Sequence, residues 1–169
     1  MKYLESVGQE PVLQVVRELE TEQSLLALAS DIGHAVIDPT SDGAGIIYLS
    51  GELGAGKTTF CRGLICSLGH GGAVKSPTFT LVEPYDLPTG KVYHFDLYRV
   101  SDPEELEYLG VEDYFGEDSL CLVEWPEKGA GWLPLPDLHI QISVTRMKRR
   151  LELVAFTERG KDFLLSVCE

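Results

Sequence analysis

The residues best suited to chemistry lie in one segment, Gly51–Thr58, whose sequence GELGAGKT fits the phosphate-binding pattern G-x-x-x-x-G-K-[ST]. The glycines let consecutive backbone N–H groups converge on an anion. The Lys57 ammonium can neutralise the outer phosphates of a nucleotide, and the Thr58 hydroxyl can ligate Mg²⁺. The segment therefore predicts a site for the phosphates of a nucleotide and for a magnesium ion.

The elements that must position this loop are present on both sides of it. Residues 45–50, GIIYLS, form a short apolar run that is typical of a buried parallel strand. Residues 59–68 repeat apolar side chains at helical spacing, and Gly69 is well suited to end a helix. The positive N-terminal end of that helix would face the phosphates. Because strand, loop and helix follow in the required order, a glycine-rich turn that matches by chance is the weaker interpretation.

Two acidic residues follow apolar runs that read as strands. Asp96 follows residues 92–95, and Glu124 follows residues 120–123. Ligands of open α/β sheets gather at the carboxyl ends of parallel strands. If both strands run parallel to the loop strand, both carboxylates face the outermost phosphate, where a metal ligand and a group that places the attacking water are needed. Glu124 fits a Walker-B position better than Asp96 does, and the alternative is a pair of ordinary surface acids.

The remaining sequence predicts a mixed sheet with helices around it. Pro11 favours an edge position for the first strand, and the spacing around residues 86–90 favours an antiparallel hairpin. These features indicate an α/β protein with a P-loop NTPase-like, mixed, largely parallel sheet, flanked by helices and bearing antiparallel edge strands. The order of the strands is left open. Further strands are expected at residues 11–19, 78–85, 91–97, 119–124, 137–145 and 149–157, a loop at 126–136, and further helices at 21–37, from 101 onwards and at 158–167.

Length and composition fit a single domain over residues 1–169, with residues 1–10 as an N-terminal extension. No apolar run approaches the roughly 20 residues of a membrane span, and the first residues lack the pattern of a signal peptide. The four cysteines form no C-x-x-C pair and no cluster of metal ligands, which indicates reduced thiols. We therefore expect a cytoplasmic protein without membrane attachment.

The charge of the chain bears on its partners. A formal net charge of −13 disfavours unaided binding to a nucleic-acid backbone, whereas a protein partner is easily accommodated. One local exception is the cationic group Arg146, Lys148, Arg149 and Arg150. These side chains could contact a nucleotide, a nucleic acid or a partner, or they could belong to a solvated strand end.

The composition also indicates which nucleotide is bound. The chain contains no asparagine, so it cannot carry the N-K-x-D segment with which GTPases commonly read guanine. ATP is therefore the expected nucleotide. Two alternatives to an ATPase are a small-molecule or nucleoside kinase and a non-hydrolysing nucleotide sensor. The stretch 100–135 contains no arginine, which counts against the arginine-rich lid of a kinase.

Several motifs together resemble the TsaE (YjeE) family, the ATPase component of bacterial tRNA threonylcarbamoyladenosine synthesis. The phosphate loop alone is widely shared, whereas the combination of S-P-T-[YF]-T, H-F-D-L-Y-R and E-W is far more specific. The order and spacing of the matching segments agree from about residue 20 to residue 130. The segments are Gly51–Thr59, Lys75–Glu83, His94–Arg99, Asp102–Glu107 and Leu122–Trp125.

The resemblance implies a small Mg²⁺-dependent ATPase that binds the partner proteins TsaD and TsaB. In that family, TsaD transfers a threonylcarbamoyl group to the adenosine beside the anticodon of tRNAs that read ANN codons. The ATPase does not perform the transfer, and its ATP cycle resets the complex between turnovers. Contact with tRNA would then be indirect, through the complex.

The resemblance also implies roles for individual residues. Lys57, Asp96 and Glu124 are the expected catalytic residues, with Asp96 as a metal partner or a group that positions water. Thr58, Glu124 and Asp96 are the expected metal-site residues. Contacts to the base are expected from Glu22 and Arg149. The residues expected to bind the nucleotide phosphates are Leu53, Gly54, Ala55, Gly56, Lys57, Thr58 and Thr59.

Other positions carry weaker expectations. Ser76 and Thr78 lie in a segment that resembles a nucleotide-dependent switch, and Phe79 stands where tyrosine is frequent in the family. Trp125 is open to three interpretations: a core residue, a cover for the metal site, or a surface on which a partner stacks. His94 lies within a strand, which favours a structural role over a catalytic one.

Overall fold

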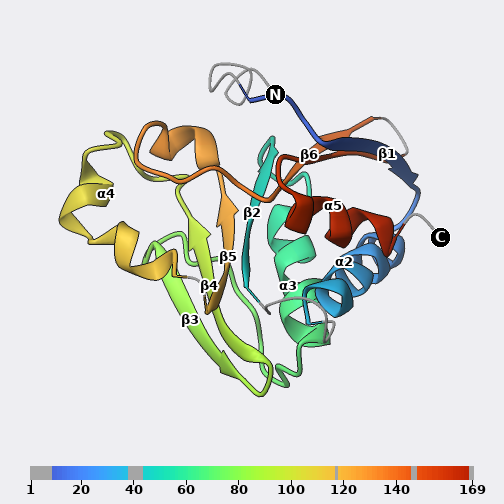
Figure 1. The fold of residues 1–169 in the computed structure, drawn as a ribbon, viewed down its shortest axis with the longest axis horizontal. Helices are drawn as coiled ribbons and strands as arrows, with labels where there is room; N and C mark the ends of the chain where they lie inside the picture. Colours follow the sequence, from blue (N-terminus) through green and yellow to red (C-terminus); the bar gives the residue numbers. More distant parts are fainter. Residues whose placement is uncertain (1–8, 38–43, 117, 146–147, 168–169) are drawn as a thin grey trace.

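The computed structural model describes residues 9–37, 44–116, 118–145 and 148–167. Its strands form one seven-stranded sheet in the order β1-β7-β6-β2-β5-β4-β3 (Figure 1). The strands are β1 (Leu13–Leu19), β2 (Gly45–Gly51), β3 (Val82–Leu87), β4 (Gly90–Asp96), β5 (Ser119–Glu124), β6 (Leu138–Val144) and β7 (Arg149–Ala155). The helices are α2 (Glu22–Val36), α3 (Lys57–Ser67), α4 (Glu105–Tyr108) and α5 (Glu158–Leu165), with 3-10 helices η1 (Val111–Tyr114) and η2 (Pro126–Gly129). Residues 1–8 of the expected extension, and Arg146, lie outside the described part.

The central strands run parallel, and both edges of the sheet are antiparallel. β2 pairs in parallel with β5 and β6, and β5 pairs in parallel with β4. β3 is antiparallel to β4, β7 to β6, and β1 to β7. This arrangement confirms the expected fold class, the hairpin and the edge position of the first strand. β5 is buried along its whole length, which explains its apolar run at residues 120–123.

The start of α2 and the end of α3 lie where the sequence signals place them. At the start of α2, Thr21 Oγ1 accepts a hydrogen bond from Ser24 N at 3.0 Å, and Ser24 Oγ accepts one from Thr21 N at 3.2 Å. This reciprocal pair satisfies two N–H groups that the helix itself cannot satisfy. Beyond the C-terminal end of α3, Gly69 has a φ of 103°, a conformation that favours glycine.

Three expected boundaries are wrong. The strand expected from residue 78 begins only at Val82, because Leu81 has a φ of 68° and its N–H closes a turn onto Pro77 O at 2.7 Å. The helix expected from residue 101 is reduced to the four residues of α4, since Gly110, with a φ of 61°, turns the chain into η1. The expected loop at 126–136 contains the single turn η2.

The two faces of the sheet are covered differently. Helices α2, α3 and α5 lie over one face, and α4 lies on the opposite side of the strands (Figure 1). Successive residues of β2 therefore enter different cores: Ile47 packs under the helices, whereas Tyr48 packs with Phe95 and other aromatic side chains on the other face. Both faces of the sheet are thus packed in hydrophobic cores at the strand that leads into the phosphate loop.

Two further expectations can be compared with the structure. No helix in the described ranges is long and apolar enough to cross a membrane. Cys61, Cys66 and Cys121 are free thiols, as the sequence indicated, and Cys168 lies outside the described residues.

Candidate active site

The phosphate loop joins β2 to α3 at the carboxyl end of the parallel strands. Glycine is required at both of its ends. A Cβ atom on Gly51 would lie 2.3 Å from the backbone oxygen of Ile142, and Gly56, directly before α3, has a φ of 116°. The first N–H groups of α3 have no partner within the helix and are available to an anion. The loop thus has the geometry that a phosphate site needs.

Lys57 is held by its own loop. Its Nζ atom donates to Gly51 O at 2.6 Å and to Glu52 O at 2.9 Å, and it lies 3.9 Å from the centre of the Trp125 ring. Burial lowers the pKa of the Lys57 ammonium, while Glu124 and other nearby carboxylates oppose that shift. The ammonium therefore remains beside the loop and can exchange carbonyl partners for phosphate oxygens.

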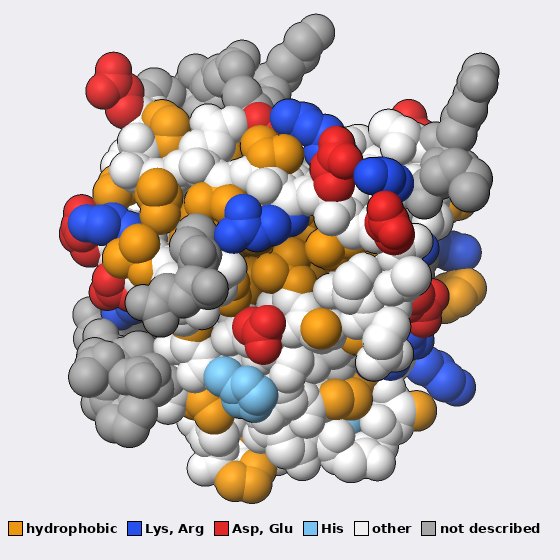
Figure 2. All heavy atoms as spheres, turned by 90° about the vertical axis from the view of Figure 1, so that its right-hand side faces the viewer, with side chains coloured by type: hydrophobic (Ala, Val, Ile, Leu, Met, Phe, Trp, Pro, Cys, Tyr) orange, Lys and Arg blue, Asp and Glu red, His pale blue; other side chains and the backbone are white. Residues whose placement is uncertain are grey.

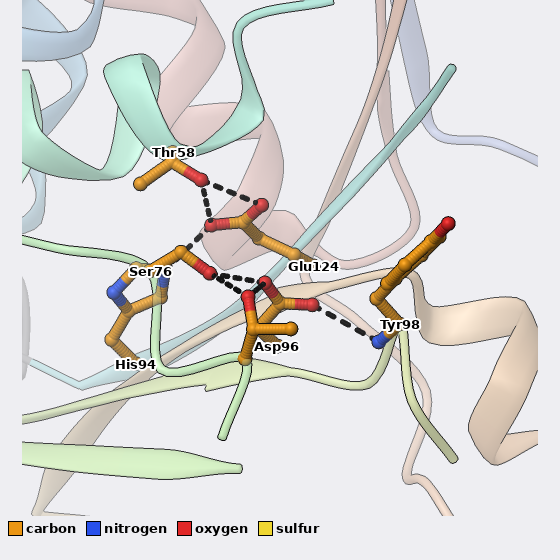
Figure 3. Close-up of polar contacts among 7 residues, drawn as sticks. Thr58, Ser76, His94, Asp96, Tyr98 and Glu124 are labelled. Carbon is orange, nitrogen blue, oxygen red and sulfur yellow. Dashed lines mark hydrogen bonds and ion pairs between the residues drawn. The ribbon is translucent and has the colours of Figure 1, made fainter. Parts of the chain in front are cut away.

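Glu124 contacts polar side chains from two different elements. Thr58 Oγ1, at the start of α3, lies 2.9 Å from Glu124 Oε1 and 3.1 Å from Oε2. His94 Nε2, from β4, lies 2.8 Å from Glu124 Oε1 (Figure 3). The Glu124 side chain is almost fully buried, so these two contacts set the direction of its carboxylate.

Asp96 lies directly beside Glu124, because the two residues are register partners in the parallel pair of β4 and β5. Asp96 Oδ2 accepts hydrogen bonds from the hydroxyls of Ser76 and Thr78, the latter at 2.8 Å, and Oδ1 accepts from Tyr98 N at 3.0 Å (Figure 3). These donors compensate for the burial of the carboxylate. The segment that resembles a switch is therefore attached to Asp96.

These groups line a single cavity of about 270 Å³. It brings together all three expected catalytic residues, Lys57, Asp96 and Glu124. The hydroxyl of Thr58 and the two carboxylates offer oxygen ligands, the type that Mg²⁺ prefers, so the residues present fit this ion. The lining residues are Leu53, Gly54, Gly56, Lys57, Thr58, Thr59, Ser76, Thr78, Asp96, Tyr98, Glu124 and Trp125.

Three of the expected nucleotide-binding residues do not line this cavity. Ala55 is buried beneath the loop, and its carbonyl oxygen accepts a hydrogen bond from Arg149 Nε at 3.2 Å. Glu22 forms an exposed ion pair with Arg62 at 3.3 Å, between the start of α2 and the middle of α3. Arg149 therefore reaches the back of the loop, and Glu22 contacts the helix that follows it. The expectation that Glu22 and Arg149 contact the base stays a prediction.

Trp125 lies at the mouth of the cavity. It has a φ of 58°, its ring packs against Tyr98 at 5.1 Å between centres, and its face covers the Lys57 ammonium. Of the three interpretations of this residue, a cover for the site fits its position. Phe79 is 84% exposed, and the guanidinium of Arg99 lies 4.0 Å from the centre of its ring.

The sequence analysis missed a buried group next to Glu124. The ligand atoms of Cys61, His94 and Glu124 lie within 4.8 Å of one another, so the expectation that no cysteine joins a cluster of potential metal ligands is wrong. Burial and nearby carboxylates raise the pKa of the Cys61 thiol well above its usual range, which favours the neutral thiol, a poor metal ligand. Strand alternation was the available signal, since His94 and Asp96 are two residues apart and share a face of β4.

A parallel sheet that carries this loop at its carboxyl edge defines a P-loop NTPase-like fold. The chain is similar to the crystal structure of YdiB from Bacillus subtilis, with a TM-score of 0.76 and 28% sequence identity over 94% of this chain and 97% of that one. The class of protein is therefore fixed by the fold, and the sequence comparisons define the family within it.

Residues 19–151 match the family described as threonylcarbamoyl adenosine biosynthesis protein TsaE. The chain is 47% identical to a protein of Haemophilus influenzae over 85% of this chain and 90% of that one. It is 38% identical to a protein of Bacillus subtilis over 73% of this chain and 75% of that one. Both relatives are named tRNA threonylcarbamoyladenosine biosynthesis protein TsaE. The chain belongs to the TsaE family, whose members are involved in tRNA threonylcarbamoyladenosine biosynthesis.

Proposed function

We propose that this chain is a Mg²⁺-dependent ATPase subunit that acts on a TsaD–TsaB complex in the cytoplasm and is required to form threonylcarbamoyladenosine in ANN-decoding tRNAs. One observation carries the proposal: the phosphate loop, Lys57, Thr58 and the buried carboxylates Asp96 and Glu124 converge on one cavity. Family membership supports the tRNA pathway, and the absence of asparagine supports ATP over GTP.

The binding step begins with Lys57. Its ammonium now bonds to the carbonyl oxygens of Gly51 and Glu52, which are neutral acceptors. The oxygens of a phosphate group share its negative charge and are stronger acceptors than a neutral carbonyl. Lys57 therefore exchanges its partners when a nucleotide enters. The free N–H groups at the start of α3 bind the same phosphates. Trp125 covers the ammonium and limits the access of water.

The hydrolytic step depends on the two carboxylates. The Glu124 carboxylate accepts a hydrogen bond from the Thr58 hydroxyl, so it can orient a water molecule or a ligand of the metal. Asp96 lies beside Glu124 and accepts hydrogen bonds from Ser76 and Thr78. It therefore connects the site of hydrolysis to the segment around residues 76–80. Bound Mg²⁺ would supply charge neutralisation on the phosphates, with Thr58, Glu124 and Asp96 as its available oxygen ligands.

The charge distribution supports a protein partner rather than tRNA as the direct contact. The net charge is −13, and the Lys and Arg side chains on the face in Figure 2 are scattered among Asp, Glu and apolar side chains. A stripe of basic residues, which is the usual mark of direct binding to a nucleic-acid backbone, is not formed on that face.

Calorimetry with ATP and MgCl₂ tests the binding part of the proposal. The unsubstituted chain should release heat of binding, and Lys57→Ala should lose it, because the loop then has no side-chain cation for the outer phosphates. Lys161→Ala is the matched control, since Lys161 pairs with Glu158 on the surface of α5. Equal binding by all three proteins would contradict the proposed site.

Phosphate release, measured with and without TsaD and TsaB, separates the proposed function from the two alternatives. An ATPase subunit releases phosphate and supports tRNA modification when the partners are added. A nucleotide sensor binds ATP but releases no phosphate in either case. A kinase consumes ATP in proportion to an added acceptor molecule.

A further inference from the structure

His94 is a fully buried polar side chain that ends at the carboxylate of Glu124. It lies on β4, two residues before Asp96, so strand alternation directs both side chains to the same side of the sheet. Its Nε2 atom is 2.8 Å from Glu124 Oε1. His94 does not line the cavity itself and therefore reaches the site only through Glu124.

The tautomer of His94 follows from its surroundings. Among the described residues, Nδ1 has no hydrogen-bond partner, whereas Nε2 faces a carboxylate oxygen. Both carboxylate oxygens of Glu124 accept from Thr58 Oγ1, so in the contact with His94 the Nε2 atom carries the hydrogen and donates it. A proton on Nδ1 would be a buried donor without an acceptor, which is unfavourable. The tautomer with its hydrogen on Nε2 satisfies both conditions.

The two donors to Glu124 differ in what else they can do. Thr58 belongs to the loop helix, and its hydroxyl faces the cavity, where a nucleotide or metal ion competes for it. His94 is enclosed by the core and has no such competitor. Lys57 attracts the same carboxylate electrostatically, so Glu124 without His94 would be free to turn toward the ammonium.

The geometry points to His94 as a positioning residue, which donates from Nε2 to Glu124 and keeps its carboxylate aimed at the reacting water and metal position during turnover. This inference rests on the proposed ATP hydrolysis, and it assigns to His94 a role that strand placement alone did not indicate. Partners that orient a ligand or catalytic group from behind typically contribute about 10- to 100-fold to activity.

Two substitutions of similar volume separate positioning from packing. His94→Gln keeps an N–H donor near the place of Nε2, whereas His94→Met fills the space without a donor. We expect kcat for ATP hydrolysis to fall about 10- to 100-fold in His94→Met and to remain within a few-fold of the unsubstituted protein in His94→Gln. KM for ATP and the affinity for ADP should change little in both, because His94 does not touch the phosphates.

Titration of the active site with ADP gives the fraction of each variant that is folded and able to bind, and each rate is divided by that fraction. The midpoint of urea unfolding shows whether a variant has lost stability. Glu124→Gln combined with His94→Met should be no slower than Glu124→Gln alone, because the imidazole acts only through that carboxylate. Equal rates for His94→Met and the unsubstituted protein, equal losses in Met and Gln, or additive losses in the double variant would overturn the inference. Failure of the unsubstituted protein to hydrolyse ATP, alone and with TsaD and TsaB, would instead refute the proposed function.

Discussion

Two buried histidines lie on opposite sides of the strand that leads into the phosphate loop. His94 is on β4, beyond β5, and His139 is on β6. Within the described residues, each uses Nε2 for a hydrogen bond and leaves Nδ1 without a partner. His94 contacts the carboxylate of Glu124, whereas His139 contacts Ser50 Oγ at 2.9 Å. Both histidines are thus buried, and they differ in their hydrogen-bond partner. Only His94 is bonded to a residue of the candidate active site that is an expected catalytic group.

The sheet register explains the difference between the two sides. Level with Leu49 of β2, β5 presents Glu124 and β6 presents Ile140. β5 ends at that level and β4 ends beside it at Asp96, so two carboxylates meet at the edge where the loop begins. β6 continues to Val144 and pairs with β7, so its corresponding position is sealed in the core. We therefore expect substitutions on the β4–β5 side to change the rate of ATP hydrolysis. Substitutions on the β6–β7 side should change the free energy of unfolding.

The largest expected effect is on the β4–β5 side. Glu124→Gln should slow ATP hydrolysis by about 100-fold or more while ATP still binds, because the amide keeps the shape but cannot accept a proton or offer a charged ligand. Glu152→Gln on β7 is the matched control, since the Glu152 carboxylate accepts a hydrogen bond from Gln14 and pairs with Arg150, away from the cavity. Phosphate-release rates measure both variants. A comparable loss in Glu152→Gln would remove the distinction between the two sides.

The next effect concerns stability in acid on the β6 side. Burial lowers the pKa of His139 from 6.5 to about 3. The unfolded chain binds a proton at this residue below about pH 6.5, while the native chain does so only near pH 3. The free energy of unfolding should therefore fall by ~1.4 kcal/mol per pH unit from this residue as the pH drops between these values.

Urea unfolding of the unsubstituted protein and of His139→Gln at pH 7, 5.5 and 4.5 tests this contribution. We expect His139→Gln to be less stable at pH 7, because it alters a buried site, but to lose less stability on acidification. Other titrating groups act in both proteins and cancel in the difference. Parallel pH profiles would show that His139 titrates alike in the folded and unfolded chains.

The smallest effect is expected at the start of α5. Thr157 Oγ1 accepts a hydrogen bond from Gly160 N at 3.1 Å and donates one to Asp137 Oδ1 at 2.6 Å. Thr157→Ala removes this helix cap and should lower the free energy of unfolding by about 1 kcal/mol. The rate of phosphate release should not change. Thr157→Ser, which keeps the hydroxyl, is the control, and thermal unfolding with an activity assay distinguishes a cap from a residue needed for turnover.

Much of the fold was predictable because its signals are local. The strand, loop and helix around Gly51–Thr58 appear in the chain in the order that the structure confirms, and Thr21 is the cap of α2 as expected. The boundary at Val82 was not predictable from apolar patterning, because a left-handed residue at Leu81 breaks an otherwise strand-like run. Turn geometry at a non-glycine residue is imposed by tertiary contacts rather than by propensity.

The sequence alone determined the phosphate loop, the two candidate carboxylates and the α/β class, because glycine spacing, apolar runs and the residues that follow them are properties of neighbouring positions. Tertiary structure decided which groups meet. Asp96 and Glu124 are 28 positions apart in the chain and become register partners only when β4 and β5 pair in parallel. The same pairing brings His94 into contact with Glu124, and the packing of α3 encloses Cys61 beside them. Side chains that are distant in sequence become neighbours only when the core forms.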